Sequence, residues 1–427
     1  MSVKSEDPKS AKDSGLGSIG RIIHSAANLE ASAAQQLVPR ILEAVRINLG
    51  MEVGFVSRFS RGRREFLHVS SDGLTGAPSP GSSDLLEDSA CIRVARNHAP
   101  NLVLDAQTHP SLKDLAAVRA LQVRTHASVP IPSGKGYAFG TLCCYSCGQK
   151  DELDERDIGF MSAMADLIGT VLEEEQHLLD DFCRRREYIR GVVKSEGLQM
   201  VWQPIVDSMT GRLVGMESLA RFQTDPYRPP NQWFDEAVAL GIGTELEKNA
   251  FAKGFAIREY LPKDVYVSCN LSGATFLEPE FQEFLKQQEL DQIVLEITEH
   301  DAIADYKELV SSLSEFRNQG MKLAIDDFGA GYAGFRHILE LNPDIIKLDM
   351  SLIRNIDRNP MMQSVVKALV AFAGDHDLTL LAEGIENREE LSALQSLGVS
   401  RAQGYFFHKP MPMAPLLGLL NEVNQAS

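Results

Sequence analysis

The chain has 427 residues, of which 44% are hydrophobic and 24% are charged, so it is long enough for two or three globular domains with buried cores. Its net charge of −17 argues against a surface that coats nucleic-acid polymers, and no apolar run approaches membrane-spanning length. The N-terminus is polar rather than signal-like and the six cysteines have no secretory context, so we expect a reducing, cytoplasmic location.

The first 150 residues are expected to form a disordered tail followed by one α+β domain. Residues 1–20 are rich in Ser, Lys, Asp and Gly and hold few apolar side chains, so they cannot bury a core. In residues 21–150, periodic apolar positions predict helices, and alternating runs around Ser60-Arg61-Gly62 predict a hairpin. The glycine at 140 falls inside a strand and indicates a close backbone approach. The predicted helices are 34–49 and 89–97, and the predicted strands are 53–59, 66–70, 127–131 and 137–145.

This segment resembles the GAF domain family, a group of α+β sensory modules. The resemblance rests on the order of the elements and on the motifs Ser89-Ala90-Cys91, Leu102-Val103-Leu104-Asp105, Ala127-Ser128-Val129-Pro130-Ile131 and Phe139-Gly140-Thr141-Leu142. It implies a regulatory input from a small molecule or a partner protein, and the fold alone does not identify which. Pigment-carrying members attach their chromophore at a Cys followed by His. No Cys of this chain has that neighbour, so we expect no covalent pigment.

Three cysteines in this domain, Cys143, Cys144 and Cys147, raise the question of a metal or redox site. Cys143 and Cys144 are adjacent in a predicted strand, so they should point to opposite faces. No second group of ligands follows at the spacing of a zinc motif. Core packing, in which a free cysteine acts as a small hydrophobic residue, is therefore the favoured interpretation.

Residues 151–196 contain the longest helical pattern and are interpreted as a linker. Eight apolar side chains alternate at spacings of three and four residues, with interruptions at Glu175 and Arg185. One interpretation is a helix packed on its own domain. The other is a parallel dimer helix that carries the state of the sensor forward; the position between two domains favours it and predicts a homodimer. The eight residues are Met161, Met164, Ile168, Val171, Leu178, Phe182, Ile189 and Val192.

Strands and helices alternate through residues 197–427, which predicts an α/β fold, a (β/α)8 barrel of the TIM type. The connection at 207–212 is too short for a crossover helix, so the first two strands should be antiparallel. The predicted strands are 200–206, 213–219, 265–271, 293–297, 322–325, 345–348, 379–382 and 402–406. The predicted helices are 231–260, 280–287, 306–319, 332–339, 362–374 and 388–397.

Polar side chains stand at the carboxyl ends of seven of these strands, where such barrels carry their functional residues. Buried charges are costly unless they are paired or bind metal, and five carboxylates that converge from five strands, with one lysine, are hard to explain without cations. Every candidate ligand donates oxygen, which selects Mg²⁺ or Mn²⁺, and there are enough ligands for two cations. Two cations held close together promote the attack of water on a phosphodiester. The residues are Glu217, Asn270, Glu296, Asp326, Asp327, Lys347, Asp349, Glu383 and Gln403.

Residues 198–412 resemble the EAL domain family, the phosphodiesterases specific for cyclic di-GMP. The matching motifs follow one another in the order expected for that family. They are Gln203-Pro204-Ile205-Val206, Glu217-Ser218-Leu219-Ala220-Arg221, Asn270-Leu271-Ser272, Leu295-Glu296-Ile297-Thr298-Glu299, Asp326-Asp327-Phe328-Gly329, Lys347-Leu348-Asp349, Ala382-Glu383-Gly384-Ile385-Glu386 and Gln403-Gly404-Tyr405.

The resemblance implies a role for each motif and linear pGpG as the product. The implied ligands of a first metal ion are Glu217, Asn270, Glu296 and Asp326, and Asp326 would also bridge to a second ion held by Asp327 and Glu383. The implied catalytic residues are Lys347, which holds the attacking water, Gln403, which orients it, Glu383, and Glu299, which clamps the loop 329–331. The implied substrate contacts are Gln203, Arg221, Asp349, Glu386 and Tyr405.

Three departures from the family pattern are visible. Ser218 replaces the signature Ala and should face away from Glu217. The loop 330–334 reads Ala-Gly-Tyr-Ala-Gly in place of the usual Thr-Gly-Tyr-Ser-Ser. The segment 233–238 also differs from the family sequence, and it lies at a helix start that can influence how two barrels pair. A second hypothesis is a catalytically silent cyclic di-GMP receptor that signals through the linker helix. A third, a protein-interaction module, does not account for the converging carboxylates.

Overall fold

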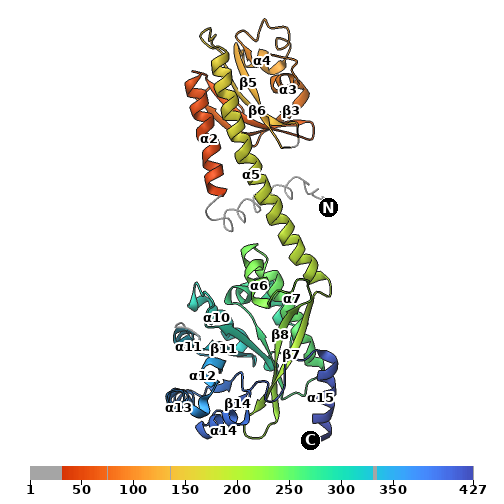
Figure 1. The fold of residues 1–427 in the computed structure, drawn as a ribbon, viewed down its shortest axis with the longest axis vertical. Coiled ribbons are helices and arrows are strands. Elements are labelled where there is room, and N and C mark those ends of the chain that lie inside the picture. The colour runs from red at the N-terminus through yellow and green to blue at the C-terminus, as the bar shows by residue number, and fades with distance from the viewer. Residues whose placement is uncertain (1–30, 75, 135, 330–333, 427) are drawn as a thin grey trace, which may run out of the picture. The chain divides into compact units, whose positions relative to one another are not determined.

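The computed structural model describes residues 31–74, 76–134, 136–329 and 334–426, and it divides into two compact units, Met1–Arg184 and Arg185–Ser427 (Figure 1). The expected disorder of residues 1–20 lies outside the described residues. Among the described residues, no helix is both long and apolar enough to cross a bilayer.

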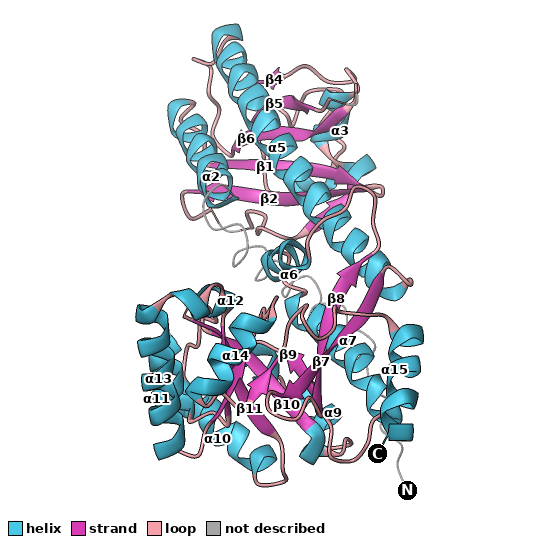
Figure 2. Cartoon of the chain, turned by 60° about the horizontal axis from the view of Figure 1, so that its bottom comes forward, coloured by secondary structure: helices cyan, strands magenta, loops and turns pink. Residues whose placement is uncertain are grey.

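Unit 1 is built on a six-stranded antiparallel sheet in the order β3-β2-β1-β6-β5-β4 (Figure 2). Helices α2 (Ala31–Asn48) and α5 (Glu155–Lys194) cover one face, and the shorter α3 (Ala90–Ala95) and α4 (Ala116–Ala120) lie on the other. The sheet has a separate apolar core on each face, because successive side chains of a strand point to opposite sides. The strands are β1 (Val53–Ser60), β2 (Arg63–Ser71), β3 (Ser83–Leu85), β4 (Leu102–Val103), β5 (Thr125–Pro132) and β6 (Ala138–Ser146).

The backbones of β6 and β1 lie close together at Gly140. A Cβ atom at Gly140 would lie 1.8 Å from the backbone oxygen of Ser57. Because that neighbour is backbone, Gly140→Ala should destabilise unit 1 by at least about 1–3 kcal/mol. Gly159→Ala is the matched control: a Cβ there meets nothing within 4 Å, and alanine favours the helix by about 0.5–1 kcal/mol.

Urea unfolding followed by far-ultraviolet circular dichroism measures this effect. Both tryptophans, Trp202 and Trp233, belong to unit 2, so their fluorescence provides an internal reference that Gly140→Ala should leave unchanged. Equal midpoints for Gly140→Ala and the wild type would contradict the close approach.

The linker helix α5 has a buried first half and a more exposed middle. Met161 and Ile168 are fully buried in the core between α5 and the sheet. Leu178, in the middle, is 48% exposed. The first half of the predicted seam therefore packs on its own domain, the interpretation that was not favoured from sequence. Of the eight seam residues, Leu178 is exposed and Phe182 partly exposed, so this segment leaves apolar side chains open to a second copy.

Unit 2 is a closed eight-stranded barrel, which confirms the predicted fold. Strand β7 is antiparallel to β8 and to β14, and the other neighbouring pairs are parallel. The strands are β7 (Leu198–Asp207), β8 (Leu213–Phe222), β9 (Tyr266–Asn270), β10 (Ile293–Thr298), β11 (Lys322–Phe328), β12 (Ile345–Leu348), β13 (Thr379–Ala382) and β14 (Arg401–Ala402). The helices include α6 (Pro230–Ala239), α7 (Gly243–Phe255), α8 (Gly273–Leu277), α9 (Pro279–Leu285), α10 (Tyr306–Arg317), α11 (Gly334–Leu341), α12 (Met350–Ile353), α13 (Pro360–Asp375), α14 (Arg388–Leu397) and α15 (Met413–Ala426).

Two predicted boundaries in the barrel are wrong. The helix expected over 231–260 is interrupted, because Gly241 has a left-handed backbone with φ +66° after α6. Strand β14 ends at Ala402 rather than Phe406. Gly404 turns the chain against the backbone of Ile385, where a Cβ atom would lie 2.2 Å from the carbonyl oxygen.

Candidate active site

The carboxyl ends of strands β8 to β14 meet at one mouth of the barrel and bring the predicted polar residues together. The antiparallel pairing of β7 with β8 sets Gln203 opposite Glu217. The parallel pairing of β9 with β10 sets Asn270 beside Glu296. Ser218, by contrast, lies against Gly254 of α7, on the other side of β8 from Glu217, as predicted.

Lys347, on β12, lies at the centre of the cluster and is fully buried. Its Nζ atom is 3.2 Å from Glu217 Oε1, 2.9 Å from Glu296 Oε1, 3.0 Å from Asp326 Oδ1 and 2.9 Å from Glu383 Oε1. Four carboxylates thus surround one ammonium group, and the site holds excess negative charge in a region of low dielectric.

The pKa shifts reflect this imbalance. Burial opposes the charge of Lys347, but the surrounding carboxylates outweigh it and hold the Lys347 pKa well above its usual range. Burial raises the pKa of Glu296 to about 8, with Lys347 opposing the rise and the neighbouring carboxylates adding to it. Burial and then the charge of Asp326 raise the pKa of Asp327 to about 6, and burial raises that of Glu383 well above its usual range. A further positive charge would relieve these carboxylates.

The acidic side chains form two groups that share one member. In the first, ligand atoms of Glu217, Glu296 and Asp326 lie within 4.8 Å of one another. In the second, those of Asp326, Asp327 and Glu383 do so. Asp326 is therefore the only one of these five carboxylates common to both groups, as a bridge between two cations requires.

The strained end of β11 explains how two adjacent aspartates serve one site. Side chains of neighbouring strand residues normally point to opposite faces. Asp327 instead has a left-handed backbone with φ +54°, which is costly for a residue other than glycine. The strand pairing is also irregular between Ile325 and Phe328. This bend brings the Asp327 carboxylate into the same group as Asp326.

Two polar residues of β9 contact Glu296. Asn270 is exposed at the rim, and its Nδ2 donates to Glu296 Oε2 at 3.2 Å. The buried Ser268 hydroxyl donates to Glu296 Oε1. Ser268 was not among the predicted site residues. Its position two residues before Asn270, and so on the same face of the strand, was the available signal.

Gln403 lies beside the carboxylates with an open acceptor. Its Nε2 donates to Glu217 Oε2 and, at 3.1 Å, to Gln203 Oε1. Its Oε1 is buried and has no hydrogen-bond partner among the described residues. An unpartnered buried acceptor and an all-oxygen ligand set both fit a site that takes hard cations with their water.

Glu299 reaches the turn that follows the two aspartates. It is almost fully buried, and its Oε2 lies 3.5 Å from the backbone nitrogen of Gly329. A Cβ atom at Gly334 would lie 2.7 Å from the same oxygen. Glu299 thus touches both edges of the turn. Residues 330–333, with two of the three changed loop positions, lie outside the described residues.

A cavity of about 300 Å³ opens beside the cluster. Three of the five predicted substrate contacts, Gln203, Glu386 and Tyr405, line it together with Glu217 and Glu383. The predicted list omitted Leu219, Met350, Gly384 and Gly404, which also line it.

The other two predicted contacts do not line this cavity. Arg221 donates to the backbone oxygen of Ala220 at 2.7 Å. Asp349 caps helix α12 by accepting from Ser351 N at 2.8 Å. The Asp349 carboxylate therefore has a structural partner, and its contact with a substrate stays a prediction.

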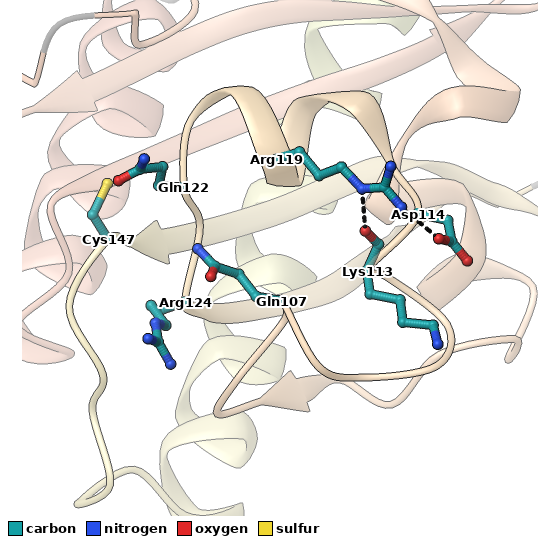
Figure 3. A pocket seen from close by; sticks show the side chains of 7 residues that line it. All are labelled: Gln107, Lys113, Asp114, Arg119, Gln122, Arg124 and Cys147. Carbon is teal, nitrogen blue, oxygen red and sulfur yellow. Dashed lines mark hydrogen bonds and ion pairs between the residues drawn. The ribbon is translucent and has the colours of Figure 1, made fainter.

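A larger pocket in unit 1, of about 770 Å³, is open and polar (Figure 3). Both of its arginines already have partners: Arg119 donates to the Lys113 backbone oxygen and pairs with Asp114, and Arg124 pairs with Asp105. We assign no ligand to it. The lining residues are Gln107, Lys113, Asp114, Arg119, Gln122, Arg124 and Cys147.

Comparison with known proteins places this geometry in a family. Residues 186–410 match the family model for the EAL domain, and residues 31–173 match that for the GAF domain. The chain is 27% identical over 247 residues to "Probable cyclic di-GMP phosphodiesterase PdeG" of Escherichia coli, covering 55% of this chain and 48% of that one. It is 28% identical over 327 residues to "Cyclic di-GMP phosphodiesterase PdeB" of Shewanella oneidensis, covering 71% of this chain and 37% of that one.

A solved structure of the EAL enzyme Bd1971, bound to cAMP and cyclic di-GMP, matches 87% of this chain and 93% of its own, at 19% identity and a TM-score of 0.51. This likeness supports the fold. The chain spans less than half the length of the two curated relatives. Because the EAL match covers more than half of the 427 residues, the chain belongs to the EAL domain family.

Proposed function

We propose that this protein is a phosphodiesterase that hydrolyses cyclic di-GMP to linear pGpG with the help of two divalent cations, Mg²⁺ or Mn²⁺. The observation that carries the proposal is the pair of carboxylate groups that share Asp326 around the buried Lys347. The names of the two curated relatives support the choice of substrate.

The side chains divide the work as follows. Glu217, Glu296 and Asp326 would hold one cation with Asn270 at the rim, and Asp326, Asp327 and Glu383 the other. Two such cations would supply positive charge against the phosphate and would lower the pKa of a bound water molecule.

Two further side chains act on the water. The Lys347 ammonium, held in place by its carboxylates, holds the attacking water and stabilises the negative charge that develops on the phosphate. The open Oε1 of Gln403 accepts a hydrogen bond from that water and so sets its direction of attack.

The cavity beside the cluster fits part of a dinucleotide. Its volume of about 300 Å³ is at the lower end for ligand pockets, so one nucleotide half fills it and the other half lies outside. Tyr405 is 59% exposed at its edge and offers a face on which a guanine base can stack. Gln203 and Glu386 supply polar contacts.

The test is an assay of the full chain with cyclic di-GMP and Mg²⁺ or Mn²⁺, followed by chromatographic separation of the products. Hydrolysis to pGpG that stops on addition of a chelator is the expected result. Tight nucleotide binding without turnover, with either cation present, would instead support the silent receptor.

We propose further that the GAF domain regulates the barrel through α5. The end of α5 is fixed to the helices of unit 2: Tyr188 stacks on Trp233 with ring centroids 5.8 Å apart, and Arg190 pairs with Glu245 at 2.8 Å. Trp233 in turn stacks on Phe222, the last residue of β8, which carries Glu217. A shift of α5 would therefore reach a metal-binding strand through two aromatic contacts.

A homodimer through the exposed part of α5, around Leu178 and Phe182, is part of this proposal. Light scattering at micromolar concentration should give the mass of two chains. A monomer at that concentration would rule out the dimer but would not contradict the proposed hydrolase activity.

Glu299 should act as a positioning residue for the metal-binding turn. Glu299→Gln keeps the size of the side chain but removes the charge that faces Gly329 N. We expect a loss of turnover at low Mg²⁺ that is largely recovered at high Mg²⁺, because the ligands themselves remain. A titration of rate against Mg²⁺ measures the shift, with the exposed Glu289→Gln as the control. An unchanged midpoint would show that Glu299 does not hold the turn.

A further inference from the structure

Three side chains that are far apart in the sequence meet inside unit 1. Cys91 comes from α3, His126 from β5 and Cys143 from β6, and α3 lies on the face of the sheet toward which the other two point. One ligand atom of each lies within 4.8 Å of the others, and all three residues are buried. This arrangement was not predicted, because the three residues are not spaced along the chain like the ligands of a zinc motif. They come together only in the folded domain.

The two sulfur atoms are in direct contact. Cys91 Sγ and Cys143 Sγ are 2.9 Å apart, and the Cys143 Sγ also lies 2.8 Å from the Ser128 hydroxyl. Cys144 provides the contrast. It lies on the opposite face of the same strand, is equally buried and belongs to the apolar core under α2 and α5. Simple core packing therefore describes Cys144 but not the polar contacts of Cys143.

Two buried polar groups near the sulfurs have no partner. The Nδ1 atom of His126 and the hydroxyl of Tyr145 make no hydrogen bond within the described residues, although both side chains are only 4% exposed. Both residues line a cavity of about 200 Å³ whose other walls are largely apolar, among them Phe55, Phe66 and Leu115. Unpartnered buried polar atoms are rare in folded proteins and indicate a missing ligand, ion or water.

The charges around the cluster suit bound thiolates. Arg64 Nη1 donates to Cys91 Sγ at 3.0 Å, and the same guanidinium pairs with Asp84. The positive charge of Arg64 is thus balanced by Asp84. Two thiolates at Cys91 and Cys143 would then be neutralised by one divalent cation. Hydrogen bonds donated to metal-bound sulfur from such neighbours are common in metal sites.

We propose that Cys91, His126 and Cys143 form a binding site for a thiophilic divalent cation such as Zn²⁺, with its fourth position open toward the cavity. Soft thiolate ligands with one imidazole select such ions, and three protein ligands leave room for an exogenous one. Binding displaces the thiol protons to solvent. Sulfurs bound to one tetrahedral ion at about 2.3 Å lie roughly 3.8 Å apart, so the two Sγ atoms must separate by about 1 Å.

The test is a titration of the reduced full-length protein with Co²⁺ in place of Zn²⁺, followed by near-ultraviolet absorption. Thiolate ligands give an intense charge-transfer band with Co²⁺, whereas the carboxylates of the barrel do not, so the two sites are distinguished in one sample. We expect one equivalent of Co²⁺ to produce the band and Zn²⁺ to remove it by competition.

Variants assign the ligands. Cys91→Ser and Cys143→Ser should each weaken Co²⁺ binding at this site by at least about 100-fold, more than outer-shell changes usually do. His126→Gln should weaken it as well, and Cys144→Ser should keep the wild-type band. Absence of the band in the wild type under reducing conditions would overturn the proposal, whether or not the two cysteines form a disulfide in air. So would a band that persists in both Cys91→Ser and Cys143→Ser.

Discussion

Replacement of Lys347 by methionine is expected to abolish hydrolysis and to lower the stability of the cation-free barrel by about 3–5 kcal/mol. The Nζ atom is within 3.2 Å of four carboxylates and is fully buried. Methionine fills a similar volume but leaves those carboxylates without a countercharge. Removal of one partner of a buried ion pair lowers the stability by more than the lost attraction, because the remaining charges stay buried without a countercharge.

The Trp202 and Trp233 fluorescence reports unfolding of the barrel alone and so measures this loss directly. Millimolar Mg²⁺ should restore part of the stability of Lys347→Met, since the cation replaces the missing charge, but it should not restore turnover. Lys322→Met, at the exposed start of the neighbouring β11, is the control and should change neither property much. Wild-type stability of cation-free Lys347→Met would show that the ammonium does not hold the carboxylates together.

The second large effect is expected for Asp326→Asn, which should lower the rate of hydrolysis by at least about 10³-fold, the upper range for loss of one electrostatic stabiliser. The substitution keeps the shape of the side chain and removes the charge that both carboxylate groups share. Both cations should therefore bind more weakly. Glu217→Gln affects only the first group, so one cation should still bind to that variant.

Calorimetric titration with Mn²⁺ distinguishes the two variants by the number of ions bound. We expect two in the wild type, one in Glu217→Gln and none at comparable concentration in Asp326→Asn. The control is Asp264→Asn, an exposed carboxylate paired with Arg212 at the surface. Two Mn²⁺ ions in Asp326→Asn, bound with wild-type affinity, would rule out the bridge.

The barrel and its cluster could be predicted because each depends on local sequence. Alternating elements imply the barrel, and a barrel places every strand end at the same mouth, so the residue after each apolar run is a candidate ligand. Contacts that form only in the fold could not be predicted from the sequence. Asp349 follows β12 as expected, but the sequence did not show that it also caps α12 by accepting from Ser351 N. Arg221 lies at the end of β8 and still does not line the cavity.

Unit 1 shows the same limit more strongly. The apolar seam of α5 predicted a second helix packed against it. The first half of the seam packs instead on the sheet of its own domain. The position of Cys143 in a strand predicted a buried thiol, which is correct. The neighbours of that thiol, Cys91 and His126, come from two other elements. The periodicity of the sequence does not show that these three residues lie together, because their proximity depends on the order of the strands in the sheet.

The reversal of one strand decides at which mouth of the barrel the chain enters unit 2. Because β7 runs against β8, its first residue, Leu198, pairs with Phe222, the last residue of β8. Helix α5 ends at Lys194, only a few residues earlier, so the chain enters at the mouth that carries the carboxylates. In an all-parallel barrel the same helix would join at the opposite mouth, a strand length away from the chemistry. The direction of β7 thus makes the entry point of the chain a neighbour of the active site.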